Sequence, residues 1–396
     1  QLTYAGVGCQ VAHITTPGIA ARAAAARLLV LHRVPMDGYV EKLIRSVHAH
    51  GGIVLYDTDD LIFDPSAFQW IHSPDFQDPI RVRVYQAEMR RQRQTLDACN
   101  GVLVSTDYLA ELVRQLDKPV WVHRNAANFE MLLQSQAAVR RPADDRVVIG
   151  YASGTPTHNR DFALVTPALE AVLDQFPPAE LWLIGYLDLP AELARFGARV
   201  RTLPPVNWRD LPALLARLDL NLAPLVLDNP FSQSKSEIKF MEAALVGVPT
   251  LASATNAFQF AIRSGQNGLL IHQDTDWFAG LQALMDPQFR QALGRQARAD
   301  VLTQYTPPER SRSAVETLNA VGLHLNRPLG LEFCPNPAQD PTQLNWPPEA
   351  DAYPALTQMA LYSLRRRGPG TLFKQVWIYL RRLLSRWIPY GGKAAR

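Results

Sequence analysis

The residues best suited to chemistry lie close together, in the segment SKSEIKFME that runs from Ser234 to Glu242. Because residues advance by about 100° along a helix, Lys235, Lys239 and Glu242 would share one face. Apolar residues fill the rest of this predicted helix, and such a narrow polar stripe suits an element that lines a cleft. Ammonium groups near a helix N-terminus favour an anion, and a carboxylate further along can accept hydrogen bonds from hydroxyl groups. The stripe therefore predicts a site for a phosphate at one end and a diol at the other, as in a nucleotide sugar.

Local signals indicate where this helix begins and ends. Ser234 is predicted to be its N-cap residue, with Glu237 three positions later completing a capping box. Gly247 is predicted to end the helix, ahead of a short buried strand. An alternative interpretation remains open, in which Lys239 and Glu242 form a surface ion pair and bind no ligand.

Several segments together resemble glycosyltransferase family 4, whose members are retaining enzymes with the GT-B fold. The run EAALVGVPTLAS, residues 242–253, is similar to the donor-site signature of that family. Residues 218–225 and 264–271 are similar to the strand before this signature and to the turn and strand after it. The resemblance covers residues 145–320 well and residues 25–130 more loosely. It implies a nucleotide-diphosphate sugar (UDP-, GDP- or dTDP-linked) as co-substrate, with no required cofactor and no metal.

The donor signature departs from the family pattern at one place. A first glutamate usually precedes the second by eight positions, and Ser234 stands there in this chain, followed by Lys235 where glycine or proline is usual. The chain therefore resembles a sub-group with a Ser-Lys pair in place of that glutamate and its neighbour. The resemblance implies that Glu242 holds the ribose, whereas the sugar-binding role does not transfer to Ser234. We also predict donor contacts from Ser234, Ser236 and Lys239.

A small polar loop follows the first strand predicted for the second half of the chain. Ligands of open α/β sheets bind beyond the carboxyl ends of the strands, so Gly154, Thr155, His158 and Arg160 are predicted to contact the donor. Gly154 would let the backbone approach a phosphate, and a helix predicted to begin near Asp161 would aim its N–H groups there. For His158, the alternative is an ordinary turn residue.

Two more loops complete the predicted site. The resemblance implies that residues 204–208 border the nucleobase, with Val206 as a donor contact, whereas Trp208 is more often a packing residue. Asp59 stands near the place where many relatives carry a histidine, and we expect it to contact donor or acceptor hydroxyls. A metal-binding role for Asp57 and Asp59 is disfavoured, because GT-B enzymes hold the diphosphate with cations and helix ends. The remaining alternative is a turn in which these aspartates cap the backbone.

The predicted catalytic residues are Lys235, Arg160 and Asp59. Departure of the diphosphate leaves negative charge on the β-phosphate, which Lys235 and Arg160 would stabilise. Asp59 would orient the sugar. In retaining enzymes of the resembled type, the departing phosphate itself takes the proton of the acceptor, so no dedicated base is expected.

The composition limits the class of protein. The chain has 396 residues, 47% hydrophobic and 19% charged, which suffices for two globular domains. A net charge of +3 is no signature of a nucleic-acid partner. Cys9, Cys99 and Cys334 lack metal or disulfide spacing, and such sparse cysteines fit a reducing cytosol. No signal peptide or long apolar run is present, so we expect a cytoplasmic protein.

Short apolar runs alternate with helical patterns along the chain, which predicts βαβ units and the α/β class. The predicted architecture is GT-B, with two facing Rossmann-like domains built on parallel sheets and a C-terminal helical tail. Its predicted parts are an N-terminal acceptor domain (1–135), a linker (136–146), a nucleotide-sugar donor domain (147–325), a Pro-rich crossover (326–358) and a basic amphipathic helical tail (359–396).

The two ends of the chain carry predictions of their own. Residues 1–8 look like a fragment leading into a strand at Cys9–Ile14, so we expect that the true N-terminus is missing. The tail combines arginines and lysines with aromatic and aliphatic residues, which suits contact with an anionic inner-membrane surface. The alternative is a tail that packs back on the N-terminal domain.

These features lead to one expected function and two alternatives. The expectation is a glycosyltransferase that moves a sugar to a glycan or lipid-linked acceptor, in synthesis of a bacterial surface polysaccharide such as an O-antigen. This product rests on family analogy alone. A GT-B nucleotide-sugar epimerase would isomerise the donor without an acceptor. A non-catalytic nucleotide-sugar-binding or scaffold subunit would bind the donor without turnover.

Overall fold

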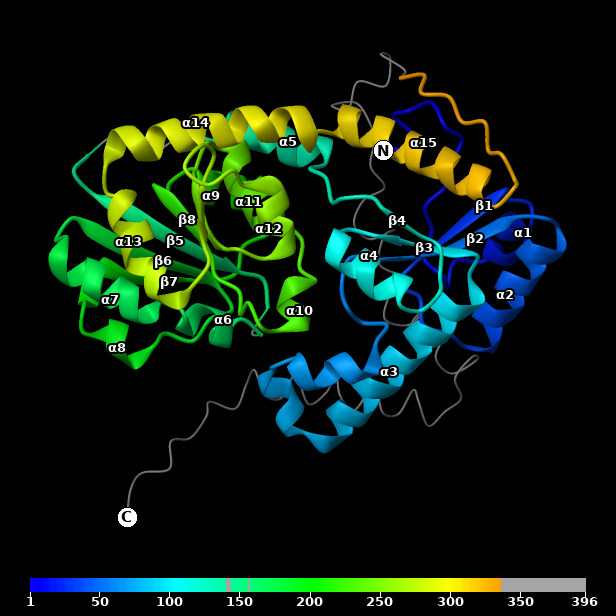
Figure 1. Ribbon diagram of the computed structural model, residues 1–396, viewed down its shortest axis with the longest axis horizontal. Coiled ribbons are helices and arrows are strands. Elements are labelled where there is room, and N and C mark those ends of the chain that lie inside the picture. Colours follow the sequence, from blue (N-terminus) through cyan, green and yellow to red (C-terminus); the bar gives the residue numbers. More distant parts are fainter. Residues whose placement is uncertain (140–143, 156, 336–396) are drawn as a thin grey trace.

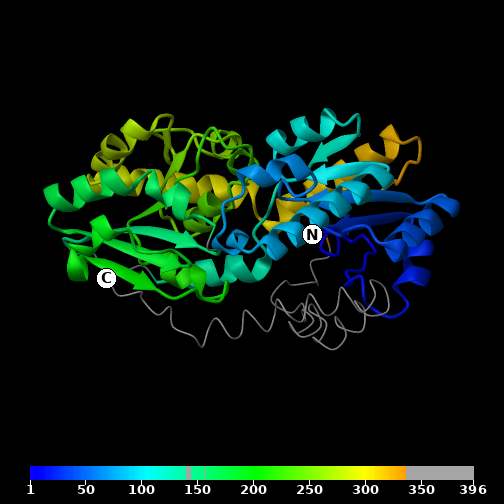
Figure 2. The same ribbon diagram turned by 90° about the horizontal axis from the view of Figure 1, so that it is seen from below.

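A computed structural model describes residues 1–139, 144–155 and 157–335. The chain forms two lobes, each built around one parallel sheet with helices on its faces (Figures 1 and 2). The α/β class and the two Rossmann-like domains of the GT-B architecture are thus confirmed. The predicted helical tail and most of the Pro-rich crossover lie outside the described residues.

The first lobe contains a sheet in the order β1-β2-β3-β4. Its strands are β1 (Leu28–His32), β2 (Ile53–Thr58), β3 (Gly101–Val104) and β4 (Val120–Val122). Its helices are α1 (Ile19–Ala24), α2 (Gly38–Ala49), α3 (Pro79–Ala98) and α4 (Asp107–Arg114), with the short 3-10 helices η1 (Pro65–Trp70) and η2 (Pro74–Gln77). All neighbouring strands pair in parallel, so their carboxyl ends meet at one edge of the sheet.

The second lobe contains a sheet in the order β10-β9-β8-β5-β6-β7. Its strands are β5 (Val147–Ser153), β6 (Ala179–Gly185), β7 (Val200–Leu203), β8 (Leu220–Ala223), β9 (Thr250–Ser253) and β10 (Leu269–Ile271). Its helices are α5 (Phe129–Ala137), α6 (Asn159–Ala163), α7 (Thr166–Gln175), α8 (Ala191–Ala194), α9 (Leu211–Leu215), α10 (Pro230–Gln233), α11 (Ile238–Leu245), α12 (Asn256–Ala261), α13 (Trp277–Ala283) and α14 (Pro287–Gln304), with 3-10 helices η3 (Gly197–Arg199) and η4 (Asp274–Asp276). The strand order reverses at β5, where ligands of doubly wound sheets bind.

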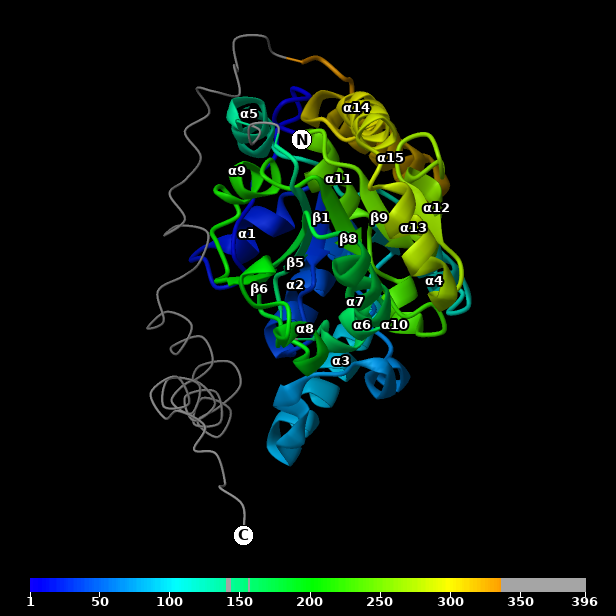
Figure 3. The same cartoon turned by 90° about the vertical axis from the view of Figure 1, so that its left-hand side faces the viewer.

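The chain crosses between the lobes twice, and the two crossings lie side by side. The first follows β4, and the second joins α14 to α15 (Pro307–His324). At this place the backbone N–H of Ala127 donates a hydrogen bond to the carbonyl oxygen of Tyr305 at 3.0 Å. Figures 1 and 3 show α14 and α15 along the side of the molecule opposite α3.

Because of the crossings, one helix packs on each lobe although it follows the sheet of the other lobe in sequence. Helix α5 follows the first sheet in sequence but contacts α9 and α11, and its Met131 packs against the core of the second lobe. Helix α15 follows the second sheet but packs Leu318 and Val321 against Ile53 and Leu55 of the first. The packing therefore differs from the predicted limits 1–135 and 147–325, because apolar contacts rather than order along the chain decide where these helices lie.

Two local predictions are wrong. No strand forms at Cys9–Ile14, where Val11 is fully exposed, and β1 pairs only with β2. An apolar run without a neighbouring strand has no partner for its backbone groups. The helix predicted to begin near Asp161 is divided into α6 and α7, because Pro167 lies at the start of α7 and lacks the N–H that a continuous helix needs.

Among residues 1–139, 144–155 and 157–335, no helix combines the length and the apolar character that a membrane crossing requires.

Candidate functional site

Helix α11 presents the polar stripe that the sequence predicts, but it begins later than expected. Ser234 is the C-cap residue of α10, where its hydroxyl donates to the carbonyl of Phe231 at 2.7 Å. Asn229 caps and starts α10, so a separate short helix already occupies this segment. Glu237 precedes α11 and makes no capping contact with it. The predicted capping box between Ser234 and Glu237 is therefore wrong.

Lys239 and Glu242 do not form the surface ion pair of the alternative interpretation. The Lys239 ammonium donates to the carbonyl oxygen of Ala152 at 2.6 Å, and it lies 4.2 Å from the centroid of the Tyr151 ring. Both contacts are at the carboxyl end of β5. The carboxylate of Glu242 is half-buried and accepts no hydrogen bond from any of the described residues.

Burial acts in opposite directions on these two side chains. It raises the pKa of Glu242 to about 7, although the positive charge of Lys239 partly opposes the change. It lowers the pKa of Lys239 to about 8, against the attraction of Asp161 and Glu242. Two half-buried charges without a close ion-pair contact between them destabilise a fold, so this arrangement is better explained by a ligand than by packing.

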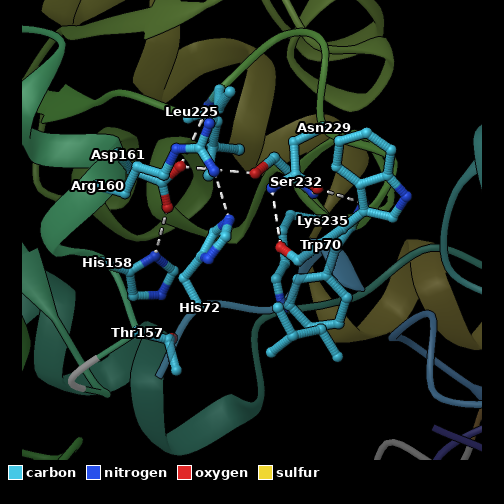
Figure 4. A pocket seen from close by; sticks show the side chains of 13 residues that line it. Trp70, His72, Thr157, His158, Arg160, Asp161, Leu225, Asn229, Ser232 and Lys235 are labelled. Carbon is cyan, nitrogen blue, oxygen red and sulfur yellow. Dashed lines mark hydrogen bonds and ion pairs between the residues drawn. The ribbon is translucent and has the colours of Figure 1, made fainter. Parts of the chain in front are cut away.

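A small pocket opens between the two lobes beside α10 (Figure 4). The first lobe contributes Trp70, Ile71 and His72, which end η1 and follow it. The second lobe contributes residues from the loop after β5 and from the segment between β8 and α11, namely Thr157, His158, Arg160, Asp161, Leu225, Val226, Asn229, Phe231, Ser232 and Lys235. The pocket therefore brings together three of the predicted residues: Lys235, Arg160 and His158.

The wall formed by the β5 loop is held by Asp161. One oxygen of this carboxylate accepts from the backbone N–H of Val226 at 3.1 Å, and the other lies 2.9 Å from Nδ1 of His158. Burial lowers the pKa of His158, so its ring is mainly neutral at physiological pH. Arg160 points across the pocket and contacts Nε2 of His72 (Figure 4). His158 is thus a fixed pocket residue, and Arg160 places a guanidinium at the boundary between the lobes.

A second group of charges lies where Lys235 meets the first lobe. The Lys235 ammonium is 2.5 Å from Oδ1 of Asp60 and 4.1 Å from the centroid of the Phe231 ring. Arg33 contacts both neighbouring carboxylates, at 3.2 Å from Asp59 and 3.1 Å from Asp60. Asp59 therefore lies near the cleft as a partner of Arg33, and its neighbour Asp60 is the residue that reaches Lys235.

The other predicted donor contacts lie outside this pocket. Thr155 is exposed, and its hydroxyl lies 2.8 Å from that of Thr157; a side chain at Gly154 would meet open space. Ser236 accepts a hydrogen bond from the amide of Asn125 at 2.9 Å, across the boundary between the lobes. Val206, which follows β7, is 40% exposed and is free to contact a ligand.

Most of the residues that line the pocket and the cleft were not predicted, among them Trp70, His72, Arg33 and Asp60. Trp70 ends η1 and His72 follows it, in a stretch of sequence where no periodicity marks a function. Arg33 directly follows β1 and has a backbone φ of +50°, which is uncommon for a side chain other than glycine. The placement of Arg33 and Asp60 at adjacent strand ends was the available signal, since carboxyl ends of parallel strands meet.

Beside the crossings, a buried polar cluster joins the lobes. The hydroxyl of Tyr305 donates to Oε1 of Glu237 at 2.7 Å, and Nη1 of Arg124 lies 3.8 Å from the same oxygen. Arg124 also contacts Asp107 and stacks 3.4 Å from the centroid of the Phe260 ring. Burial raises the pKa of Glu237. The stability of this cluster therefore depends on each hydrogen-bond donor that faces the Glu237 carboxylate.

Among the residues that the structure describes, no group of three or more His, Cys, Asp or Glu side chains is arranged to hold a metal ion.

Comparison with known proteins agrees with this geometry. Residues 146–286, which lie in the second lobe, match the family described as "Glycosyl transferases group 1". No curated protein matches the chain.

Solved structures resemble both lobes together. A sucrose-phosphate synthase from Thermosynechococcus elongatus is 16% identical, with a TM-score of 0.53 over 77% of each chain. Anabaena Alr3699/HepE in complex with UDP is 15% identical, with a TM-score of 0.54 over 76% of this chain and 81% of that one. A glycosyltransferase from Rickettsia africae ESF-5 is 11% identical, with a TM-score of 0.53 over 79% and 84%. At these identities the likeness establishes the GT-B fold.

Proposed function

We propose that this protein is a retaining glycosyltransferase that uses a nucleotide-diphosphate sugar. The observation that carries the proposal is the half-buried carboxylate of Glu242, which has no hydrogen-bond donor among the described residues, on a helix whose Lys239 reaches the carboxyl end of β5. A ribose diol would supply the missing donors. The group 1 match over residues 146–286 covers this helix.

The cations of the pocket suit the diphosphate. Lys235 and Arg160 both border the space between the lobes, and His158 is held beside them with its ring mainly neutral. In the proposed reaction, the bond between the anomeric carbon of the sugar and the β-phosphate oxygen breaks. Lys235 and Arg160 stabilise the charge that develops on the departing diphosphate. The acceptor oxygen bonds to the anomeric carbon on the same face, and its proton passes to the departing phosphate.

The other assignments are made on position. Gly154 and Thr155, in the loop after β5, and Ser236, beside α11, border the donor. Val206 contacts the nucleobase. Asp59 orients the sugar from the first lobe, where it is held by Arg33. The acceptor is a glycan or lipid-linked glycan of a bacterial surface polysaccharide, and the protein acts in the cytoplasm, peripherally at the inner membrane face.

Calorimetric titration with UDP, GDP, dTDP and ADP, with and without Mg²⁺, tests the donor site. One nucleotide should bind independently of the metal. UDP is the first candidate, because the structurally similar Alr3699/HepE was solved in complex with UDP. Glu242→Gln should lose this binding, whereas Glu192→Gln, on the exposed surface of α8, should retain it. Equal affinity in wild type and Glu242→Gln would remove the ribose assignment.

Product analysis separates the proposal from the two alternatives. Nucleotide release that requires an acceptor, with the anomeric configuration of the donor kept in the product by NMR, supports a retaining transferase. An isomerised donor without an acceptor would identify an epimerase. Binding without turnover would favour a scaffold subunit, an alternative that the serine at position 234 supports.

A further inference from the structure

Asp60 of the first lobe forms an ion pair with the ammonium group of Lys235, which the proposed function assigns to the donor diphosphate. Its Oδ1 lies 2.5 Å from Nζ of Lys235, and the two side chains are only 19% and 25% exposed. The contact joins residues 175 positions apart and connects the two lobes directly. A carboxylate on an ammonium resembles a phosphate oxygen in charge and in hydrogen-bond geometry.

The carboxylate is held in place from the first lobe. Its Oδ2 accepts from Arg33 at 3.1 Å, so each oxygen of Asp60 has its own cation. The backbone is fixed as well, because the hydroxyl of Thr58 donates to the carbonyl of Asp60 at 2.8 Å and accepts from its N–H at 3.2 Å. Asp60 is therefore presented to Lys235 in a fixed position at the end of β2.

Both cations can keep a partner if Asp60 and Lys235 separate. Lys235 remains over the ring of Phe231, 4.1 Å from its centroid, and Phe231 lies on the same lobe. Arg33 retains Asp59 at 3.2 Å. Separation therefore costs one ion pair between the lobes and leaves neither cation without a contact.

We propose that Asp60 is a positioning residue that holds Lys235 in the cleft until a donor diphosphate displaces it. This proposal rests on the proposed function. The diphosphate and the carboxylate of Asp60 compete for the ammonium of Lys235. Breaking the ion pair therefore lowers the observed affinity for the donor. The same displacement releases a tie between the lobes and couples donor arrival to their movement.

The variant Asp60→Asn tests this competition. It keeps the size of the side chain and removes its charge, so UDP, GDP or dTDP, whichever binds the wild type, should bind about fivefold to tenfold more tightly by calorimetry. The corresponding nucleosides, which lack phosphates, should show no change. Asp57→Asn is the matched control, because Asp57 lies near the end of β2, three residues before Asp60, but pairs with His32 at 2.6 Å. Its diphosphate affinity should equal that of the wild type.

Thermal unfolding supplies a readout that a merely structural role would not give. Without nucleotide, Asp60→Asn should unfold at a lower temperature than the wild type; with saturating nucleotide, this difference should disappear or reverse. In a Lys235→Gln background, Asp60→Asn should no longer change nucleotide affinity, because the contested ammonium is gone.

Three results would overturn the proposal, and they are distinguishable. Equal or weaker diphosphate binding by Asp60→Asn, with clear binding by the wild type, would refute the competition alone. An equal gain in Asp57→Asn would reduce the effect to general electrostatics. Absence of nucleotide binding in the wild type and in every variant would refute the proposed function and this inference with it.

Discussion

Replacing Glu242 by glutamine should stabilise the ligand-free protein at neutral and alkaline pH while it abolishes nucleotide binding. The side chain is half-buried, and burial raises its pKa from 4.5 to about 7. Between these values the folded chain holds a proton that the unfolded chain has released. Raising the pH through this window therefore favours unfolding. A carboxylate at this position costs stability, and glutamine has no charge to desolvate.

The pKa change sets the size of the effect. Above pH 7, a difference between 4.5 and about 7 corresponds to about 3 kcal/mol of lost stability. Water still reaches part of the side chain, and the variant loses the attraction of Lys239. We therefore expect a net gain of about 1–2 kcal/mol in the free energy of unfolding at pH 8. At pH 4.5, where Glu242 is protonated in the folded wild type and about half protonated in the unfolded chain, most of the gain should be absent.

Urea unfolding at pH 4.5 and at pH 8, followed by tryptophan fluorescence, measures the free energy of unfolding under both conditions. Glu192→Gln, on the exposed face of α8, controls for the general loss of one negative charge. A Glu242→Gln protein that is less stable than the wild type at pH 8 would show that the carboxylate supports the fold. A gain of equal size at both pH values would refute the role of ionisation.

Three other perturbations should follow from the packing. Burial lowers the pKa of Lys239 to about 8, so the wild type should gain stability as the pH rises from 8 to 10.5, and Lys239→Met should lack this gain in urea titrations. Tyr305→Phe removes the hydroxyl that faces the buried Glu237, and should lower the free energy of unfolding by about 1–3 kcal/mol in urea at pH 7. Gly294→Ala would place a Cβ 2.2 Å from the carbonyl oxygen of Gly247, and should destabilise the packing of α14 by about 1–3 kcal/mol in the same assay.

Each of these expectations has a contrary outcome. If the stability of Lys239→Met rises with pH as it does in the wild type, a group other than Lys239 causes the rise. Tyr186, which is 45% exposed, provides the control for Tyr305, since Tyr186→Phe should be neutral. Wild-type stability in Tyr305→Phe, or in Gly294→Ala, would mean that the contact in question relaxes without cost.

The central strands were predictable because each is a short, mainly apolar run that is buried on both faces. Residues Leu220–Ala223 and Thr250–Ser253, for example, are buried throughout, and the sequence shows them as continuous runs between turn residues. Helix α11 was predictable for the same reason, together with its polar stripe. Ser234 misled the prediction because serine is a favoured N-cap residue, whereas here the preceding Asn229-Pro230 pair starts a short helix that ends at Ser234.

The contacts of the site were harder to predict than its elements. Arg33 and Asp60 are 27 residues apart and meet only because β1 and β2 pair in parallel with ends aligned. Lys235 and Asp60 meet only through the placement of one lobe against the other. His72 lies on an irregular segment without a repeating pattern. Sequence spacing carries no information on such meetings, whereas the stripe of Lys239 and Glu242 lies within a single helix.

The exchange of α5 and α15 between the lobes determines how this molecule can be divided. A fragment that ends after β4 would expose Ile53 and Leu55, because Leu318 and Val321 of α15 cover them. A fragment beginning at β5 would lose the cover that Met131 of α5 gives to the second lobe. Independent production of the lobes would therefore need cuts at the crossings themselves, with α15 supplied to the first lobe as a separate or rejoined segment. Two chains cut between α14 and α15 should reassemble by this exchange, which makes the crossing a natural position for a split protein.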